Sequence, residues 1–356
     1  MFNSLSLPLL LLIFVGAAAA VWVAGVKLSD TTDVLSRRLG LGQALGGLIL
    51  LSIATNLPEA AITASAALTG NLGIAIGNIL GGIAIQTVVL VVLDRFGVRG
   101  GGGPLSYRAA SLVTVLEGIL VAAVLTVVVM GKQLPPSLIV ARVAPGGLLI
   151  VALWIVGLWL IGKARTDLPW QAQGDAPGGQ EARDKARAHK TQQADHKGQS
   201  TARTALVFAG AALVTLVAGV LLERSGDRIA NHIGLSGVLF GATILAASTA
   251  IPEIATGLTS VKLGDYQLAF SDIFGGNAFL PVLFLLASLL SGQAVLPQAQ
   301  ATDIYLAGLG ILLTAVYLYG LIFRPRRRVL GLGLDSLVVL ILYAAGIVGL
   351  FAVAHG

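Results

Sequence analysis

Two glutamates lie inside long apolar runs of the chain, and each directly follows a proline. Glu59 ends the segment 52–59 (SIATNLPE), and Glu253 ends the segment 246–253 (AASTAIPE), 194 residues later. In both segments a threonine stands four residues before the glutamate. A carboxylate within an apolar span is energetically costly, and such residues usually serve function. The repeated setting therefore predicts one functional site built around Glu59 and Glu253.

The prolines indicate that both apolar helices are interrupted. Pro58 has no N–H, so the carbonyl of Ala54 loses its partner within the helix. Pro252 does the same to the carbonyl of Ser248. Freed carbonyls in a membrane helix are tolerated only where another group satisfies them or where they line a polar cavity. A bound cation is one such partner.

Helical spacing places further oxygen atoms beside each glutamate, because residues three or four apart share one face of a helix. The first stripe consists of Ser52, Thr55, Asn56 and Glu59, and the second of Ser248, Thr249 and Glu253, continued by Thr256 and Ser260. Hard cations such as calcium take roughly six to eight oxygen ligands, and two carboxylates neutralise a divalent ion. Without the ion the carboxylates repel each other, so at least one is expected to take up a proton. The site is thus suited to exchanging one cation for protons or for other cations.

The composition indicates the class of protein that holds this site. Of 356 residues, 56% are hydrophobic and only 11% are charged, whereas soluble domains carry about 25% charged residues. We therefore expect an all-α integral membrane protein. The chain has no cysteine, and its four histidines lack the spacing of a zinc hydrolase. With no nucleophile and base pair recognisable, we expect a transporter rather than an enzyme, without a resident cofactor.

Apolar runs of about 20 residues predict ten transmembrane helices. They are expected near residues 5–26, 40–69, 72–93, 109–131, 138–162, 204–222, 234–261, 266–291, 302–323 and 334–354. The first helix lacks a basic region at its start, so we expect it to be retained. The predicted domains are a first five-helix repeat over 1–162, a linker over 163–203 and a second five-helix repeat over 204–356. The linker is polar, with almost no aliphatic residues after Trp170, and is expected to be mobile.

The basic residues predict the orientation of the chain. Loops after the odd-numbered spans carry 19 of the 23 Lys and Arg residues. Basic loops stay in the cytoplasm, so both termini are expected outside and the linker inside, in a prokaryotic plasma membrane. The same rule explains the net charge of +6, so no nucleic-acid partner is expected. The expected partners are inorganic cations and the lipid bilayer.

A shift of 194 positions aligns the two halves of the sequence. The aligned positions include Thr55 with Thr249, Pro58-Glu59 with Pro252-Glu253, Gly70 with Gly264, Asn78 with Asp272, and Gly81-Gly82 with Gly275-Gly276. Each half has an odd number of predicted spans, so equivalent helices cross the membrane in opposite directions. This is the inverted repeat of secondary transporters, in which the site lies at the midplane where two broken helices meet.

The segments 46–82 and 241–276 resemble the two α-repeats of the calcium/cation antiporter superfamily, which includes the sodium/calcium exchangers. The family pattern is roughly G-T-S-x-P-E, then G-N-x-x-G-S-N-x-x-N after a variable helix. The chain has ATNLPE and STAIPE for the first element, and GNILGGIAIQ and SDIFGGNAFL for the second. The resemblance implies that Glu59 and Glu253 are the central ligands and that Thr55 and Thr249 contribute oxygens. It places the carbonyls of Ser52 and Ala246 at outer contacts of the coupling ion.

The chain departs from this pattern at three paired positions. The family serine after threonine is Asn56 or Ala250, the serine of the second element is Gly82 or Gly276, and the final Asn or Asp is Gln86 or Leu280. In the resembling exchangers these hydroxyls and amides help to build separate sodium sites, so the counter-ion is left open between sodium and protons. Asn56, Gln86 and Asn277 can rebuild an asymmetric site. Asp272 supplies a third carboxylate or, alternatively, caps the start of a helix.

The leading interpretation is a secondary antiporter that exchanges Ca²⁺ for Na⁺ or H⁺ by alternating access. The alternatives are a proton-coupled exchanger of another cation and a cation channel. The candidate cation contacts are Glu59, Glu253, Thr55, Thr249, Asn56, Ser52, Ala246, Gln86, Asn277 and Asp272. Glu117, within the fourth predicted span, is a candidate proton relay, a ligand of a separate ion, or a partner of a neighbouring helix. The carboxylates expected at the membrane interface are Asp94, Glu223, Asp303 and Asp335.

Overall fold

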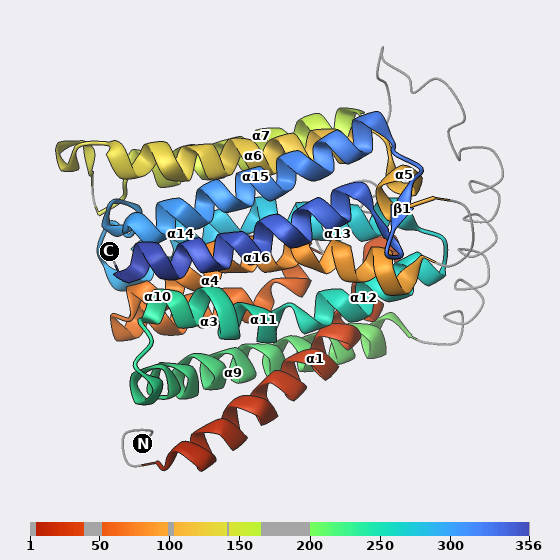
Figure 1. Ribbon diagram of the computed structural model, residues 1–356. Helices are drawn as coiled ribbons and strands as arrows, with labels where there is room; N and C mark the ends of the chain where they lie inside the picture. Colours follow the sequence, from red (N-terminus) through yellow and green to blue (C-terminus); the bar gives the residue numbers. More distant parts are fainter. Residues whose placement is uncertain (1–4, 39–51, 99–102, 141, 165–199, 356) are drawn as a thin grey trace.

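The computed structural model describes residues 5–38, 52–98, 103–140, 142–164 and 200–355, which form a bundle of helices (Figure 1). Within these ranges, eight helices are long and apolar enough to cross a membrane, and a bent helix pair is a ninth candidate. A short β-hairpin lies at one end of the bundle. The predicted all-α class is confirmed.

The eight long spans coincide with eight of the predicted ones. They are α1 (Leu7–Arg38), α4 (Leu72–Val92) continued by the π-helical turn η3 (Leu93–Gly97), α6 (Leu112–Gln133), α7 (Pro145–Ala164), α9 (Thr201–Ile233), α13 (Tyr266–Phe279) continued through the turn η6 (Leu280–Val282) to α14 (Leu283–Ser291), α15 (Ala301–Phe323) and α16 (Leu334–His355). The short elements are α5 (Leu105–Ala109), η4 (Pro136–Leu138), η7 (Leu296–Gln298), β1 (Arg328–Val329) and β2 (Leu332–Gly333). Most of the predicted linker lies outside the described residues.

The two proline segments are interrupted helices, as predicted. The predicted span 234–261 consists of two parts that meet at a 41° bend. The first part comprises the consecutive elements α10 (Gly237–Phe240), η5 (Gly241–Leu245) and α11 (Ala246–Thr249), and the second part is α12 (Ile251–Lys262). The first part of the predicted span 40–69 lies outside the described residues, and its last part is α3 (Leu57–Thr69). The chain turns at Asn56 and at Ala250, and each new helix has its proline in the first turn, where the missing N–H costs nothing.

α1 and α9 pack along each other on one side of the bundle and cross the interrupted helices (Figure 1). A Cβ atom at Gly25 of α1 would lie 2.6 Å from Cβ of Pro252 in α12. A Cβ atom at Gly219 of α9 would lie 3.0 Å from the carbonyl oxygen of Pro58 in α3. The two glycines are 194 residues apart, like the two prolines. Each outer helix therefore crosses the interrupted helix of the other half at a glycine.

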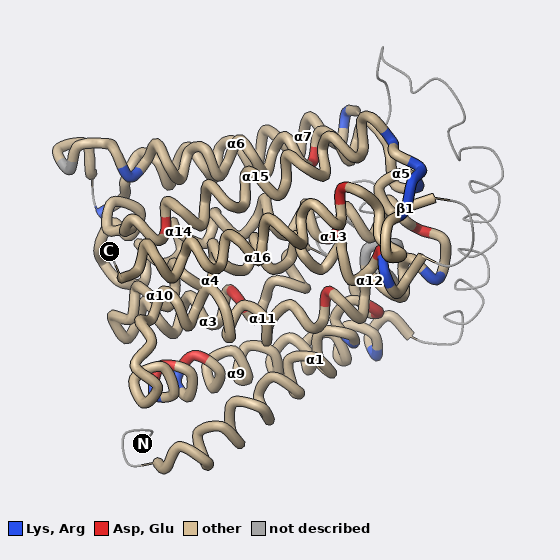
Figure 2. The backbone as a smooth tube through the Cα atoms, viewed as in Figure 1, with Lys and Arg blue, Asp and Glu red and all other residues tan. Residues whose placement is uncertain are grey.

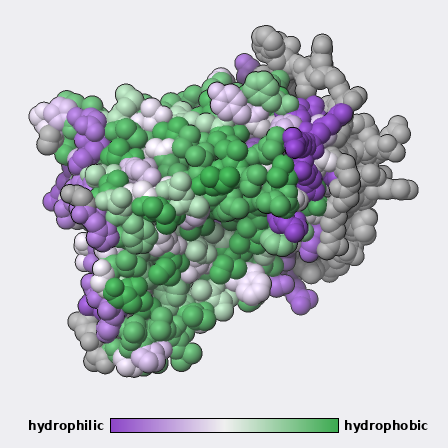
Figure 3. Space-filling model, in the orientation of Figure 1, coloured by the Kyte–Doolittle hydropathy of each residue, from purple (hydrophilic) through white to green (hydrophobic). Residues whose placement is uncertain are grey.

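The surface is that of a membrane protein. Figure 3 shows a broad apolar band between two hydrophilic ends. Figure 2 shows the described Lys and Arg residues gathered at those same two ends. The first turn of α1 and the last turn of α16 lie at one end, and the β1–β2 hairpin lies at the other (Figure 1).

The four carboxylates expected at the membrane interface are buried, and all of them except Glu223, which lies within α9, are at or near a helix end. Asp94 is fully buried and accepts hydrogen bonds from the backbone N–H groups of Leu105 (2.8 Å) and Gly333 (2.6 Å). Glu223 is also fully buried and accepts from the hydroxyl of Ser65 at 2.7 Å. Asp303 and Asp335 are buried as well. Contacts within the protein therefore enclose these side chains, and their place at the membrane interface stays a prediction.

Candidate functional site

The fold brings the two glutamates together at the starts of α3 and α12. Glu59 is 0% and Glu253 is 1% exposed. The amide nitrogen of Gln86, on α4, lies 3.4 Å from Oε1 of Glu59 and 3.5 Å from Oε1 of Glu253. The second oxygen, Oε2, of each glutamate is buried without a hydrogen-bond partner. Such buried, unpartnered carboxylate oxygens are costly and indicate a place for a cation or a proton.

The first-half residues of the predicted stripe form a connected network. Asn56 donates from Nδ2 to the carbonyl oxygen of Ser52 at 2.7 Å. Its Oδ1 accepts from the amide nitrogen of Gln86 at 3.1 Å. The hydroxyl of Thr55 lies 3.4 Å from the same Ser52 carbonyl and 3.5 Å from Oδ1 of Asp272. All of these side chains are buried, so the network lies inside the protein beside Glu59.

The second half contributes hydroxyls and a third carboxylate. Thr249 donates to the carbonyl of Ala246 at 3.1 Å and is a close neighbour of the Glu59 carboxylate. Asp272 accepts from the hydroxyl of Thr256 at 3.1 Å, in addition to that of Thr55. Asp272 therefore connects the two halves of the site.

The position of Asp272 decides one alternative left open by the sequence. It lies in the middle of α13, whereas the N-terminal cap of that helix is Asp265, which accepts from the N–H of Leu268. The capping role considered for Asp272 is wrong. Its carboxylate is directed to the site by the hydroxyls of Thr55 and Thr256 instead.

Two other residues that were predicted to offer oxygen atoms to a cation form hydrogen bonds away from the glutamates. Asn277 donates from Nδ2 to the hydroxyl of Thr87 at 3.0 Å, and its Oδ1 has no partner. Ser248 is only half-buried and bonds back to the carbonyl of Ile244 at 2.8 Å, a common use of serine in membrane helices. Asn277 is thus held against α4, and Ser248 does not join the stripe around Glu253.

Asn78 is not among the cation contacts predicted from the sequence. It lies on α4 and is fully buried, and neither its amide nitrogen nor its amide oxygen has a partner. A buried amide with both atoms unsatisfied requires an explanation such as a bound ion or water. The sequence does carry a signal, because Asn78 aligns with Asp272 under the shift of 194 positions.

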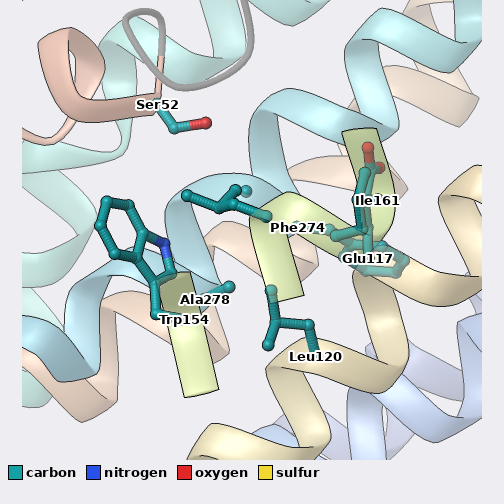
Figure 4. A pocket seen from close by; sticks show the side chains of 9 residues that line it. Ser52, Glu117, Leu120, Trp154, Ile161, Phe274 and Ala278 are labelled. Atoms are coloured by element: carbon teal, nitrogen blue, oxygen red, sulfur yellow. The ribbon is translucent and has the colours of Figure 1, made fainter. Parts of the chain in front are cut away.

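Glu117, on α6, lines a pocket that also reaches Ser52 (Figure 4). The hydroxyl of Ser271, on α13, donates to Oε2 of Glu117 at 2.7 Å, so Glu117 does contact a neighbouring helix. The pocket is small and is lined by Ser52, Glu117, Leu120, Trp154, Leu158, Ile161, Phe274, Gly275 and Ala278. Its walls are mainly apolar, and Ser52 connects it to the network beside Glu59.

The chemistry of the site is that of oxygen ligands with two negative charges. Within the described chain, neither Glu59 nor Glu253 forms an ion pair with Lys or Arg. The described residues also contain no group of three or more His, Asp or Glu side chains arranged to hold a metal. Carboxylate, hydroxyl, amide and carbonyl oxygens of the kind found beside these glutamates are the ligands that hard cations take.

Comparison with known sequences identifies relatives along most of the chain. The profile of the family described as "Sodium/calcium exchanger protein" matches residues 9–163 and 203–352. "Putative antiporter CaxA" of Alkalimonas amylolytica is 26% identical over 301 residues, covering 81% of this chain and 82% of that protein. "Inner membrane protein YrbG" of Escherichia coli (strain K12) is 26% identical over 294 residues, covering 82% and 83%.

Comparison with solved structures shows a shared fold. The H⁺/Ca²⁺ exchanger CAX superposes with a TM-score of 0.61 at 13% identity, covering 97% of this chain and 87% of that chain. The sodium-calcium exchanger NCX_Mj superposes with a TM-score of 0.58 at 16% identity, covering 96% and 98%. The fold of this chain is thus that of membrane cation exchangers.

Proposed function

The chain belongs to the sodium/calcium exchanger protein family of cation antiporters, and we propose that it exchanges Ca²⁺ for Na⁺ or H⁺ by alternating access through a site centred on Glu59 and Glu253. The observation that carries this proposal is the pair of buried Oε2 atoms without partners, on two glutamates that share one amide nitrogen. Two carboxylates neutralise one divalent cation, which favours Ca²⁺ over a monovalent substrate.

The other candidate contacts have defined parts in this proposal. Thr55 and Thr249 supply hydroxyl oxygens, and the carbonyls of Ser52 and Ala246 lie behind them. Asp272 adds a third carboxylate that links both halves. The amides of Asn56 and Gln86 lie beside the glutamates, whereas Asn277 donates to Thr87 on α4.

The proposed architecture is ten transmembrane helices in two inverted five-helix repeats, over 1–162 and 204–356, joined by a cytoplasmic linker over 163–203. Its support is the pairing of structural features at a separation of 194 residues. Gly25 and Gly219 contact opposite proline segments, and Gly70 and Gly264 both have positive φ, of 78° and 80°. In the transport cycle, α1 and α9 move over the interrupted helices and expose the glutamates to each side in turn.

A flux experiment tests this function. The purified protein is reconstituted in liposomes, and Ca²⁺ uptake is measured with and without an opposing Na⁺ or pH gradient. Antiport predicts uptake that requires one of these gradients, whereas electrically conductive uptake without a gradient would identify a channel. Uptake of another divalent cation in place of Ca²⁺, driven by a pH gradient, would favour the proton-coupled alternative.

The glutamates are tested in the same assay. Glu59→Gln and Glu253→Gln should each lower Ca²⁺ uptake by at least about 100-fold, because even the loss of outer-shell partners costs about 10–100-fold at metal sites. Glu223→Gln is the matched control, since it removes a fully buried carboxylate outside the site. It should keep Ca²⁺-dependent thermal stabilisation. Normal uptake by both glutamine variants would reject the site.

A further inference from the structure

We propose that Asn56 and Gln86 on one flank of the site, and Ala250 and Leu280 on the other, restrict it to a single cation between Glu59 and Glu253. Both flanks are closed by the protein itself, so no second cation binds beside the first. This inference rests on the proposed antiport function and concerns how many ions the same site holds.

The hydrogen bonds fix the direction of the Gln86 amide. The carbonyl of Ser52 can only accept, so Asn56 must direct Nδ2 to it, at 2.7 Å. Oδ1 of Asn56 therefore faces Gln86. Because this oxygen can only accept, Gln86 must donate to it from Nε2, at 3.1 Å. That same nitrogen faces both glutamates. Gln86 thus offers the carboxylates a hydrogen-bond donor, while its Oε1 has no partner.

The hydrogen-bond donors of Gln86 and Asn56 occupy the oxygen atoms that a second cation on this flank would need as ligands. The positive end of the Gln86 N–H dipoles lies against Oε1 of both glutamates. The Ser52 carbonyl receives the backbone N–H of Asn56 at 3.3 Å, its Nδ2 at 2.7 Å and the hydroxyl of Thr55 at 3.4 Å. A carbonyl oxygen has only two lone pairs, so it has no capacity left to coordinate an ion.

Gly276 is the third member of this arrangement. A Cβ atom there would lie 2.7 Å from Nδ2 of Asn56 and 3.2 Å from Oε1 of Gln86. Any side chain at this position would displace the amide pair. The departures at Asn56, Gln86 and Gly276 are therefore one packing unit rather than three independent changes.

The opposite flank is closed by apolar side chains. Under the shift of 194 positions, Asn56, Gln86 and Gly276 correspond to Ala250, Leu280 and Gly82. Ala250 and Leu280 are both buried in the main apolar core, and a Cβ atom at Gly82 would lie 3.3 Å from Cδ1 of Leu280. Neither Ala250 nor Leu280 carries a side-chain oxygen. The Oε2 atoms of the two glutamates are left to bind one central ion.

The test measures how Na⁺ affects Ca²⁺ binding to the purified full-length protein. Ca²⁺-dependent thermal stabilisation is titrated at several Na⁺ concentrations, with choline keeping the ionic strength constant. For one shared cation position, Na⁺ should raise the apparent Kd of Ca²⁺ with a Hill coefficient of about 1, because ligand binding stabilises by mass action. A Hill coefficient of about 2 or more, which requires two sodium ions, would overturn the proposal.

Gln86→Glu tests the flank directly, since it replaces the amide nitrogen by oxygen with little change in shape. Sodium competition should become cooperative in this variant, with a Hill coefficient above about 1.5. Gln133→Glu is the control, because it makes the same change at an exposed position of α6. An unchanged Hill coefficient for Na⁺ competition in folded Gln86→Glu protein would contradict the inference. If Gln86→Glu does not fold, the Hill coefficient of the wild-type protein decides whether the inference holds.

The two proposals fail in different ways. Wild-type protein that no divalent cation stabilises would overturn both the antiport site and this inference. Stabilisation by Ca²⁺ that depends on Glu59 and Glu253, together with cooperative competition by Na⁺, would overturn the single-cation inference alone.

Discussion

Asp272 is one of the residues that connect the two halves of the site. Its two carboxylate oxygens accept hydrogen bonds from the hydroxyls of Thr55 in the first half and Thr256 in the second. It is 4% exposed and lies in the middle of α13. A charge at this position adds to the negative field around Glu253, so it attracts a cation even if it does not bind it directly.

We expect Asp272→Asn to weaken Ca²⁺ binding by about 10-fold, within the range for groups that support metal ligands. The substitution removes one charge and keeps the size of the side chain, so the fold should persist. Asp265→Asn is the matched control on the same helix, because asparagine is an equally good helix cap. Ca²⁺-dependent thermal shifts of both variants provide the measurement. Equal affinities for the two variants would show that Asp272 has no part in binding.

Residues of the site could be predicted from the sequence where their place depends on spacing within one short segment. Thr55, Asn56 and Glu59 share a helix face, and the structure joins these neighbours to one network through Ser52, Gln86 and Asp272. The direction of the Gln86 amide could not be predicted, since it depends on a bond between Asn56 and a carbonyl. The burial of Asp94 and Glu223 also escaped prediction, because their partners lie in distant segments.

At the scale of elements, α1 and α9 are the helices that we propose to move during transport. Each crosses an interrupted helix of the other half at a glycine, Gly25 against Pro252 and Gly219 against Pro58 and Ala61. Small residues let helices approach closely in membranes. A side chain at either crossing would hold the helices apart without reaching the glutamates.

We expect Gly25→Val and Gly219→Val to lower the exchange rate by at least about 5-fold, because an overpacking strain of about 1–3 kcal/mol has to be overcome when the helices move and 1.36 kcal/mol is tenfold in rate. Ca²⁺-dependent stabilisation should remain. Gly16→Val and Gly210→Val are matched controls on the same two helices, because a Cβ atom at either glycine meets nothing within 4 Å. Exchange by the crossing variants at the rate of the controls would refute a role for these contacts.

The helices themselves could be predicted from hydropathy, but their ends could not. The predicted span 204–222 is only part of α9, which runs on to Ile233. A hydropathy reading stops at Glu223 and Arg224, the first charged residues. The helix continues because Glu223 is buried against Ser65 and Asn71 and pairs with Arg224 at 3.3 Å. Polar contacts with another helix replace the apolar environment there.

At the scale of the whole molecule, the charges and the chain ends define an orientation. The start of α1 and the end of α16 lie at one end of the bundle (Figure 1). α9 starts at Thr201, near the end of the predicted linker 163–203, in which many of the basic residues occur. Because basic segments stay in the cytoplasm, the start of α9 and the end of α16 should face opposite sides of the membrane.

The chain contains no cysteine, so single introduced thiols can test this orientation. Ala202 in the first turn of α9 and Ala354 in the last turn of α16 are both exposed, and the same Ala→Cys substitution can be made at each. We expect a membrane-impermeant maleimide to label Ala354→Cys in intact cells and to label Ala202→Cys only after the membrane is opened. Labelling of both from outside would contradict an odd number of crossings between them, and the reverse pattern would invert the topology. In the inverted case the linker would lie outside, and the charge distribution would no longer explain the orientation.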